Sequence, residues 1–321
     1  MVGIKAQYTD LTALATPEDL AQKVGSQDFF TLRLTSARLL AWSEFGKVDG
    51  VPVLFFHSSG SSRLEAKLFH QHALRAGIRL IAVDRPGIGR SEFYFSSTPG
   101  PFARDLVELL DHLRLKKVST LTLGHGAVYA LALAQLAPSR ISGQCSLGAI
   151  PCGPLLTARK TGHIKALMHR GVASLVRHGW SLRERFNQKS QDDYIETLRN
   201  ELCSFDQRAL NSSELRRIIL SDRREALVQG PRGVAQDESI GFAPFDYQLA
   251  NLSLTVEFWQ GRDESCRYGR SAFLLAAELT KGRARAVSRQ GGYFFFLEHS
   301  AQILGDLTKS RVQSSIAAAA A

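Results

Sequence analysis

The chain has 321 residues, of which 44% are hydrophobic and 22% charged, and it carries a net charge of +10. This length suits one sizeable α/β domain or a core with a lid, and no apolar run is long enough to cross a bilayer. The polar N-terminus predicts no secretory signal and a cytoplasmic location, while four cysteines without paired spacing argue against a disulfide framework or a zinc site.

The positive charge does not indicate a nucleic-acid partner. Arg and Lys residues are scattered along the chain, without interleaved aromatic residues and without a recognised binding module. A solvated basic face, or attraction to an anionic ligand, explains the charge more simply. We also find no phosphate loop, no dinucleotide fingerprint and no zinc-protease motif, so neither a cofactor nor a metal is expected.

Short apolar runs alternate with helical patterns along most of the chain. Strands are predicted at Phe29–Leu34, Leu39–Phe45, Val51–Phe56, Leu80–Val83, Val118–Leu123, Ile141–Ala149, Leu254–Trp259 and Ala284–Ser288. Helices are predicted at Leu64–Ala76, Phe102–Leu115, Ala127–Ala137, Ser271–Leu279 and Phe296–Leu307. This alternation predicts a mostly parallel sheet covered by helices on both faces.

One segment interrupts the alternation. Between Pro154 and Asp246 the chain is poor in strands, with amphipathic patterns at Leu155–Val176, Asp192–Leu210 and Ser213–Val228. We therefore predict a core over 1–153, a helical cap or lid over 154–246, the rest of the core over 247–316, and a low-complexity tail over 317–321.

Several motifs lie where strands end. His57-Ser58-Ser59-Gly60-Ser61-Ser62-Arg63 follows the third predicted strand, and Asp84-Arg85-Pro86-Gly87-Ile88-Gly89-Arg90-Ser91 follows the fourth. Farther along come Ala226-Leu227-Val228-Gln229-Gly230 with Asp237 beyond, Trp259-Gln260-Gly261-Arg262-Asp263-Glu264, and Gly291-Gly292-Tyr293 with His299 beyond.

In this order the motifs resemble those of the α/β-hydrolase superfamily, in particular bacterial esterase-like members with a helical cap. The resemblance covers roughly Phe29 to Leu304. It implies an α/β-hydrolase fold, with a nucleophile on a sharp turn between a strand and a helix. It also implies an acid at Glu264 and a catalytic histidine near Gly292.

The expected nucleophile is missing. Counted from the strand before it and from the helix after it, the nucleophile position falls on Gly124, in the sequence Leu123-Gly124-His125-Gly126. A second register places it at Gly126, which is again glycine. Counting back from His299 places the histidine at Gly292, so only the acid position, Glu264, keeps a suitable side chain. Ordinary hydrolysis by a Ser-His-Asp triad is therefore not expected.

Other residues near these positions are candidates for contact with a ligand. They are His57, Ser58, Ser59, His125 and Tyr293. His125 is also a candidate substitute base acting with Glu264, although a locally hydrogen-bonded histidine beneath the lid is the simpler interpretation.

Three functional hypotheses remain open. The first is a degenerate member that binds a small apolar or anionic molecule, or a protein partner, in or beside the old pocket. The second is an esterase-like or lyase-like enzyme using nonstandard residues such as His125 and Glu264. The third is residual or unconventional esterase activity.

Overall fold

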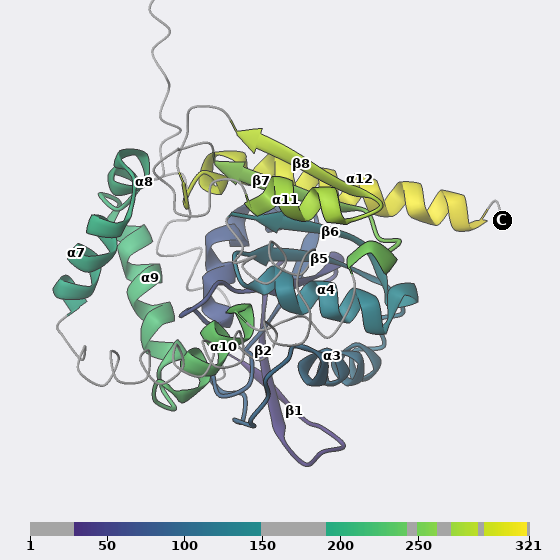
Figure 1. The fold of residues 1–321 in the computed structure, drawn as a ribbon, viewed down its shortest axis with the longest axis horizontal. Helices are drawn as coiled ribbons and strands as arrows, with labels where there is room; N and C mark the ends of the chain where they lie inside the picture. The colour runs from purple at the N-terminus through teal and green to yellow at the C-terminus, as the bar shows by residue number, and fades with distance from the viewer. Residues whose placement is uncertain (1–28, 149–190, 243–248, 262–270, 288–291, 320–321) are drawn as a thin grey trace, which may run out of the picture.

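The computed structural model describes residues 29–148, 191–242, 249–261, 271–287 and 292–319. An eight-stranded sheet runs through the protein in the order β1-β2-β4-β3-β5-β6-β7-β8 (Figure 1). Its strands are β1 (Phe30–Arg33), β2 (Leu39–Gly46), β3 (Val51–Phe56), β4 (Ile78–Val83), β5 (Val118–Leu123), β6 (Ile141–Leu147), β7 (Val256–Gly261) and β8 (Gly282–Val287). The pairs β1/β2 and β2/β4 are antiparallel and the remaining pairs are parallel. The predicted mostly parallel sheet is confirmed.

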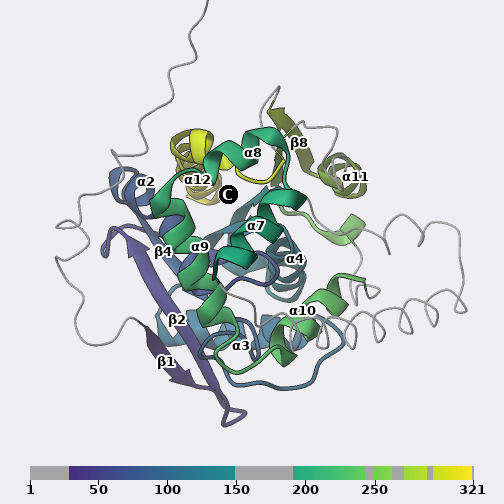
Figure 2. The same ribbon diagram turned by 90° about the vertical axis from the view of Figure 1, so that its left-hand side faces the viewer.

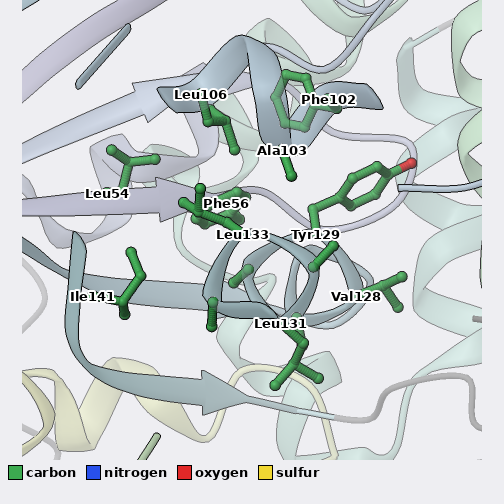
Figure 3. Packing of buried hydrophobic residues seen from close by; sticks show 14 of the residues in the cluster. Leu54, Phe56, Phe102, Ala103, Leu106, Val128, Tyr129, Leu131, Leu133 and Ile141 are labelled. Carbon is green, nitrogen blue, oxygen red and sulfur yellow. The ribbon is translucent and has the colours of Figure 1, made fainter. Parts of the chain in front are cut away.

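Helices cover both faces of the sheet because the central strands are apolar on both sides. On β3, Leu54 and Phe56 face the cluster formed with α3 (Gly100–His112), α4 (Gly126–Leu136) and α11 (Ser271–Glu278). Val53 and Phe55 face the opposite cluster, formed with the 3-10 helix η2 (Arg63–Phe69), α2 (His70–Arg75) and α12 (Phe296–Ala319). Figure 3 shows the first cluster, in which Leu133 of α4 lies beside Phe56 of β3.

Helix α4 lies in the middle of the first face. Its residues from Gly126 to Ala134 are all buried, so the helix is apolar on every side rather than amphipathic. The strand–turn–helix unit that holds Gly124 is therefore fixed by hydrophobic packing.

The described part of the predicted lid consists of helices joined by short turns. Its helices are α7 (Gln191–Glu201), α8 (Ser204–Ala209), α9 (Ser213–Ala226) and α10 (Arg232–Phe242), and they lie together at one side of the sheet (Figures 1 and 2). The predicted pattern at Leu155–Val176 lies outside the described residues. The division into core and lid remains a prediction.

Several boundaries differ from the sequence prediction. The single helix predicted over Leu64–Ala76 is a 3-10 helix followed by the short α2, and Ser62 caps its start through a bond from the Leu64 N–H. The pattern over Asp192–Leu210 divides into α7 and α8, and α10 was not predicted as a separate helix. Helix α12 continues to Ala319, past the predicted end at Leu307 and into the alanine-rich tail.

Among the described residues, no helix is long and apolar enough to cross a membrane. The same part of the chain contains no cluster of three histidine, cysteine or carboxylate side chains suited to a metal ion.

Candidate functional site

Gly124 forms the sharp turn between β5 and α4. Its φ angle is +45°, a backbone conformation in which a side chain is strained, and its N–H donates to the carbonyl oxygen of Leu147 over 2.9 Å. Strained geometry of this kind is typical of the nucleophile turn of the fold. The structure thus contains the predicted sharp turn, and the position predicted for the nucleophile carries no side chain.

Gly126 occupies a different environment. A Cβ atom on Gly126 would lie 2.5 Å from the carbonyl oxygen of Phe56 and 2.9 Å from that of His57. Such contacts leave no room for a side chain at the first residue of α4. Of the two registers, the geometry favours Gly124 as the nucleophile position.

Gly292 is buried in the segment between β8 and α12, and a carboxylate from the lid binds its backbone. Asp206 of α8 accepts hydrogen bonds from the N–H groups of Gly292, Tyr293 and Phe294, at 2.9, 2.7 and 2.8 Å. It also accepts the thiol of Cys203 at 3.2 Å. Asp206 therefore connects the predicted histidine position to α8 through hydrogen bonds. The sequence did not point to Asp206.

Of the two other residues used to locate the triad positions, only His299 lies in the described part of the chain. Glu264, the predicted acid, lies outside the described residues, so its role stays a prediction. The ring of His299, on α12, lies 6.1 Å from that of Trp259.

His57 follows β3 and is completely buried. Burial, reinforced by Arg85, holds the pKa of His57 well below its ordinary value, so the ring is neutral. Nδ1 lies 2.9 Å from the carbonyl oxygen of Ser58, which makes Nδ1 the protonated nitrogen, while Nε2 has no hydrogen-bond partner among the described residues.

Arg85 fixes the backbone of this loop. Its guanidinium donates to the carbonyl oxygens of His57 and Ser58 at 2.6 and 2.9 Å. It also pairs with Asp237 of α10 at 2.7 Å, and Asp237 accepts the Tyr129 hydroxyl at the same distance. Arg85 keeps the pKa of Asp237 below its ordinary value despite complete burial, so Asp237 is an anion that joins lid and core.

Ser58 and Tyr293, both predicted to contact a ligand, contact each other. The N–H and hydroxyl of Ser58 both donate to Glu65 at 2.6 Å, and the Tyr293 hydroxyl donates to Ser58 Oγ at 2.7 Å. Burial raises the pKa of Tyr293 well above its ordinary value, and burial also raises that of Glu65. The structure thus brings a neutral phenol and a buried carboxyl to Ser58.

Asp222 of α9 extends this polar network into the lid. It accepts the N–H and hydroxyl of Ser62 at 2.9 and 2.6 Å, and it bonds the Ser61 hydroxyl. Burial, reinforced by the nearby Glu65, raises the pKa of Asp222 from 3.8 to about 8. Asp222 is therefore largely protonated at neutral pH.

Ser59 and His125 both lie next to Glu238 of α10. The Ser59 hydroxyl donates to Glu238 Oε1 at 2.6 Å, while Glu238 Oε2 lies 3.8 Å from Nε2 of His125. The His125 ring is buried, and its Nε2 makes no hydrogen bond to any described residue. A Cβ atom on Gly241 would lie 2.1 Å from this nitrogen, so α10 carries glycine where it faces the ring.

The comparisons with known proteins agree with this architecture. Residues 53–297 match the alpha/beta hydrolase family. An esterase from Exiguobacterium antarcticum superimposes with a TM-score of 0.65 at 15% identity, over 87% of this chain and 97% of that one. A thermophilic esterase from Thermogutta terrifontis gives 0.62 at 18% identity, over 88% and 97%.

Curated relatives match over shorter regions. The dihydrolipoyllysine-residue acetyltransferase component of the acetoin cleaving system of Pseudomonas putida is 35% identical over 106 residues, which are 33% of this chain and 28% of that protein. Proline iminopeptidase of Neisseria gonorrhoeae is 29% identical over 133 residues, or 40% and 42%. The match thus spans less than half the length of either relative, whereas the family match covers most of this chain. On that match and the fold, the chain belongs to the alpha/beta hydrolase family.

Proposed function

We propose that this chain is a non-hydrolytic member of its family that binds a small, partly apolar molecule beside the Gly124 turn. The ligand at this position is either such a molecule or a protein partner. The observation that carries it is Gly124 itself, which retains the turn geometry of a nucleophile position without a side chain to attack.

The chemistry of acyl transfer supports the proposal. Hydrolysis on this fold needs an activated hydroxyl or thiol and a base that takes its proton. Glycine at position 124 supplies no hydroxyl or thiol, and glycine at position 292 supplies no base. In addition, Asp206 already accepts a hydrogen bond from the backbone N–H of Gly292. In a studied serine hydrolase, loss of the triad lowers kcat by about 10⁶.

What remains at the turn suits binding. In this fold, the backbone N–H after the nucleophile and one from the loop after β3 bind the substrate oxygen. Here those positions belong to His125 and the Ser58–Ser59 loop, which Arg85 and Glu65 hold in place. We expect a ligand to contact His57, Ser58, Ser59, His125 and Tyr293, with the buried His57 contributing mainly to the shape of the loop.

The direct test is turnover of p-nitrophenyl esters of short and medium acyl chains. We expect rates equal to buffer and heat-inactivated controls for the natural protein. The double variant Gly124→Ser/Gly292→His should gain weak turnover, because it restores the two missing groups. Gly305→Ser on α12 is the matched control, since a Cβ there meets no atom within 4 Å. Saturable, heat-sensitive turnover by the natural protein would overturn the proposal.

A second candidate is acid–base catalysis, for example in a lyase-like reaction. It is favoured by Nε2 of His125, which lies beside Glu238 and has no hydrogen-bond partner in the part of the chain that the structure describes, with Glu264 as the acid that the resemblance suggests. If turnover is found, His125→Ala, Glu238→Gln and Glu264→Gln should each reduce it at least on the order of 10²-fold, the usual contribution of a general acid or base. Turnover that is indifferent to all three substitutions would exclude this mechanism.

A further inference from the structure

We propose that the outer edge of β8 binds an extended segment of a partner protein, in which acidic and apolar residues alternate. β8 is the last strand of the sheet, and among the described strands it pairs only with β7 (Figure 1). It is separated by β6 and β7 from β5, the strand that leads into Gly124, so this surface goes beyond the proposed function.

The backbone on the outer side of β8 can pair with a further strand. The N–H of Val256 in β7 donates to the carbonyl oxygen of Lys281 at 3.3 Å, and the parallel register places Val256 opposite Gly282. Because the backbone groups of successive residues in a strand point to alternate sides, those of Ala284 and Ala286 point away from β7. Their N–H and C=O groups are the donors and acceptors that an added strand needs.

One face of β8 is basic. Lys281, Arg283 and Arg285 are exposed and alternate along the chain, so their side chains lie on the same face of the sheet. Glu257 lies opposite Arg283 on β7, and Asp306 of α12 lies 3.4 Å from Arg285. Within the described ranges, no carboxylate lies within 4.0 Å of Lys281 or Arg283. Acidic residues at alternate positions of an added strand would lie beside this basic face, at the spacing of cross-strand pairs.

The other face of β8 has small side chains and packs against α11. Ala284 contacts the apolar cluster that includes this helix, and a Cβ atom on Gly282 would collide with the carbonyl oxygen of Ala276. Phe273 and Leu274 of the same helix are 44% and 40% exposed. Larger apolar side chains of an added strand suit this face, because they would cover apolar surface that the small residues of β8 leave exposed.

The charge of β8 favours a different protein over a second copy of this chain. Antiparallel pairing of two β8 edges would set basic side chains against each other, and like charges directly opposite one another destabilise a strand pair. Charged residues protect many edge strands from self-association in this way. A strand of opposite charge meets no such penalty, so the same residues select an acidic partner.

The test uses peptides that differ in pattern and in charge. The first is labelled Val-Glu-Val-Glu-Val-Glu-Val, the second has the same composition with its glutamates in one block, and the third has lysine in place of glutamate. Each is titrated by fluorescence anisotropy at low salt, where exposed charges are least screened. We expect saturable binding of the first peptide, binding at least on the order of tenfold weaker for the second, and none for the third.

Variants then assign the binding to this edge. Ala284→Pro removes an N–H that faces away from β7, a position at which an edge strand tolerates proline, so it should abolish binding in a folded protein. Arg283→Glu should weaken binding on the order of fivefold, because it replaces an opposite-charge pair with a like-charge pair. Arg33→Glu makes the same charge change on β1, at the other edge of the sheet, and should leave binding unchanged.

Amide hydrogen exchange reports the pairing itself. Bound peptide should slow exchange at Ala284 and Ala286, whose N–H groups face away from β7 in the free protein. This measurement separates strand pairing from simple attraction between opposite charges, which would leave these amides unprotected.

Equal binding of the alternating and block peptides, binding of the lysine peptide, or no saturable binding would each overturn the inference. So would unchanged binding by folded Ala284→Pro. A concentration-dependent dimer that protects the same amides would also overturn it, because a second copy would then be the occupant. If Ala284→Pro does not fold, equal effects of Arg283→Glu and Arg33→Glu would refute the site.

Discussion

Helix α4 and the lid helices α9 and α10 are attached to the same sheet by different physical means. In α4 every residue from Gly126 to Ala134 is buried, and all are apolar apart from the hydroxyl of Tyr129. In α9 the buried residues are Leu215, Asp222 and Ala226, and Asp222 bonds the loop after β3. In α10, Glu238 accepts the Ser59 hydroxyl of the loop after β3, and Asp237 pairs with Arg85 of the loop after β4.

This difference predicts different responses to mutation and pH. The stability gained from hydrophobic burial depends on the apolar area buried and does not change with protonation. The stability contributed by a buried carboxyl depends on its partner and on whether it is charged. The lid should therefore be sensitive to pH where the turn is not. Substitutions in each region test the contrast.

The largest effect is expected at Arg63, which joins α9 of the lid to the loop after β4. Its guanidinium pairs with Asp84 at 2.6 Å and Glu225 at 2.7 Å, so Arg63→Met would leave a completely buried Asp84 without its cation. We expect a loss on the order of 3–5 kcal/mol in the free energy of unfolding at pH 7, measured by urea denaturation. Burial already raises the pKa of Asp84, so the loss should shrink at pH 5, where protonation relieves the unpaired charge. A loss that is below about 1 kcal/mol or that grows at pH 5 would contradict this account.

A smaller, pH-independent effect is expected in α4. Leu131 is 1% exposed in the apolar cluster, so Leu131→Ala should cost about 3 kcal/mol equally at pH 5 and pH 8. Leu136→Ala, on the same helix at a position that is 48% exposed, is the control and should change stability by less than about 0.5 kcal/mol. Strong pH dependence at Leu131 would show that α4 is not held by packing alone.

The smallest effect on the fold, and the one most specific to the lid, is expected for Asp222→Asn. The pKa of Asp222 rises from 3.8 to about 8 on folding, so between these values the folded protein keeps a proton that the unfolded chain releases. Its contribution to stability is full below pH 3.8 and is lost as pH rises toward about 8. Asparagine resembles the protonated carboxyl, so the variant should remain folded, with a Tm that falls less between pH 5 and pH 8.

Thermal unfolding of both proteins across this pH range is the measurement. A natural protein whose Tm rises from pH 5 to pH 8, or a variant with the same slope as the natural protein, would refute the protonated Asp222.

The sequence was informative where local pattern determines structure. Apolar runs and turn motifs predicted the sheet, the turn at Gly124 and the loop that begins at His57, because each depends on a few consecutive residues. The 3-10 geometry of η2 was missed, since Asp222 and Asp84 bind its first residues from distant parts of the chain.

The lid carboxylates could not be found in this way. Asp206 bonds residues 86 to 88 positions away, and Asp222 bonds residues 160 and 161 positions away. In an amphipathic helix, an acidic residue of this kind is indistinguishable from one that faces solvent. Asp237 and Arg85 were noticed only within the family motifs, and nothing in the sequence indicated that they pair. Glu238 gave no signal, although its Oε2 lies 3.8 Å from Nε2 of His125.

If the proposed function is correct, no activated nucleophile remains beside the Gly124 turn. Incubation with a fluorophosphonate that labels activated serine hydroxyls, followed by intact-mass measurement, tests it most directly. We predict an unmodified mass for the natural protein and a single adduct, mapped to position 124, for the Gly124→Ser/Gly292→His variant. A stoichiometric adduct on the natural protein, at Ser58, Ser59 or any other residue, would contradict the claim.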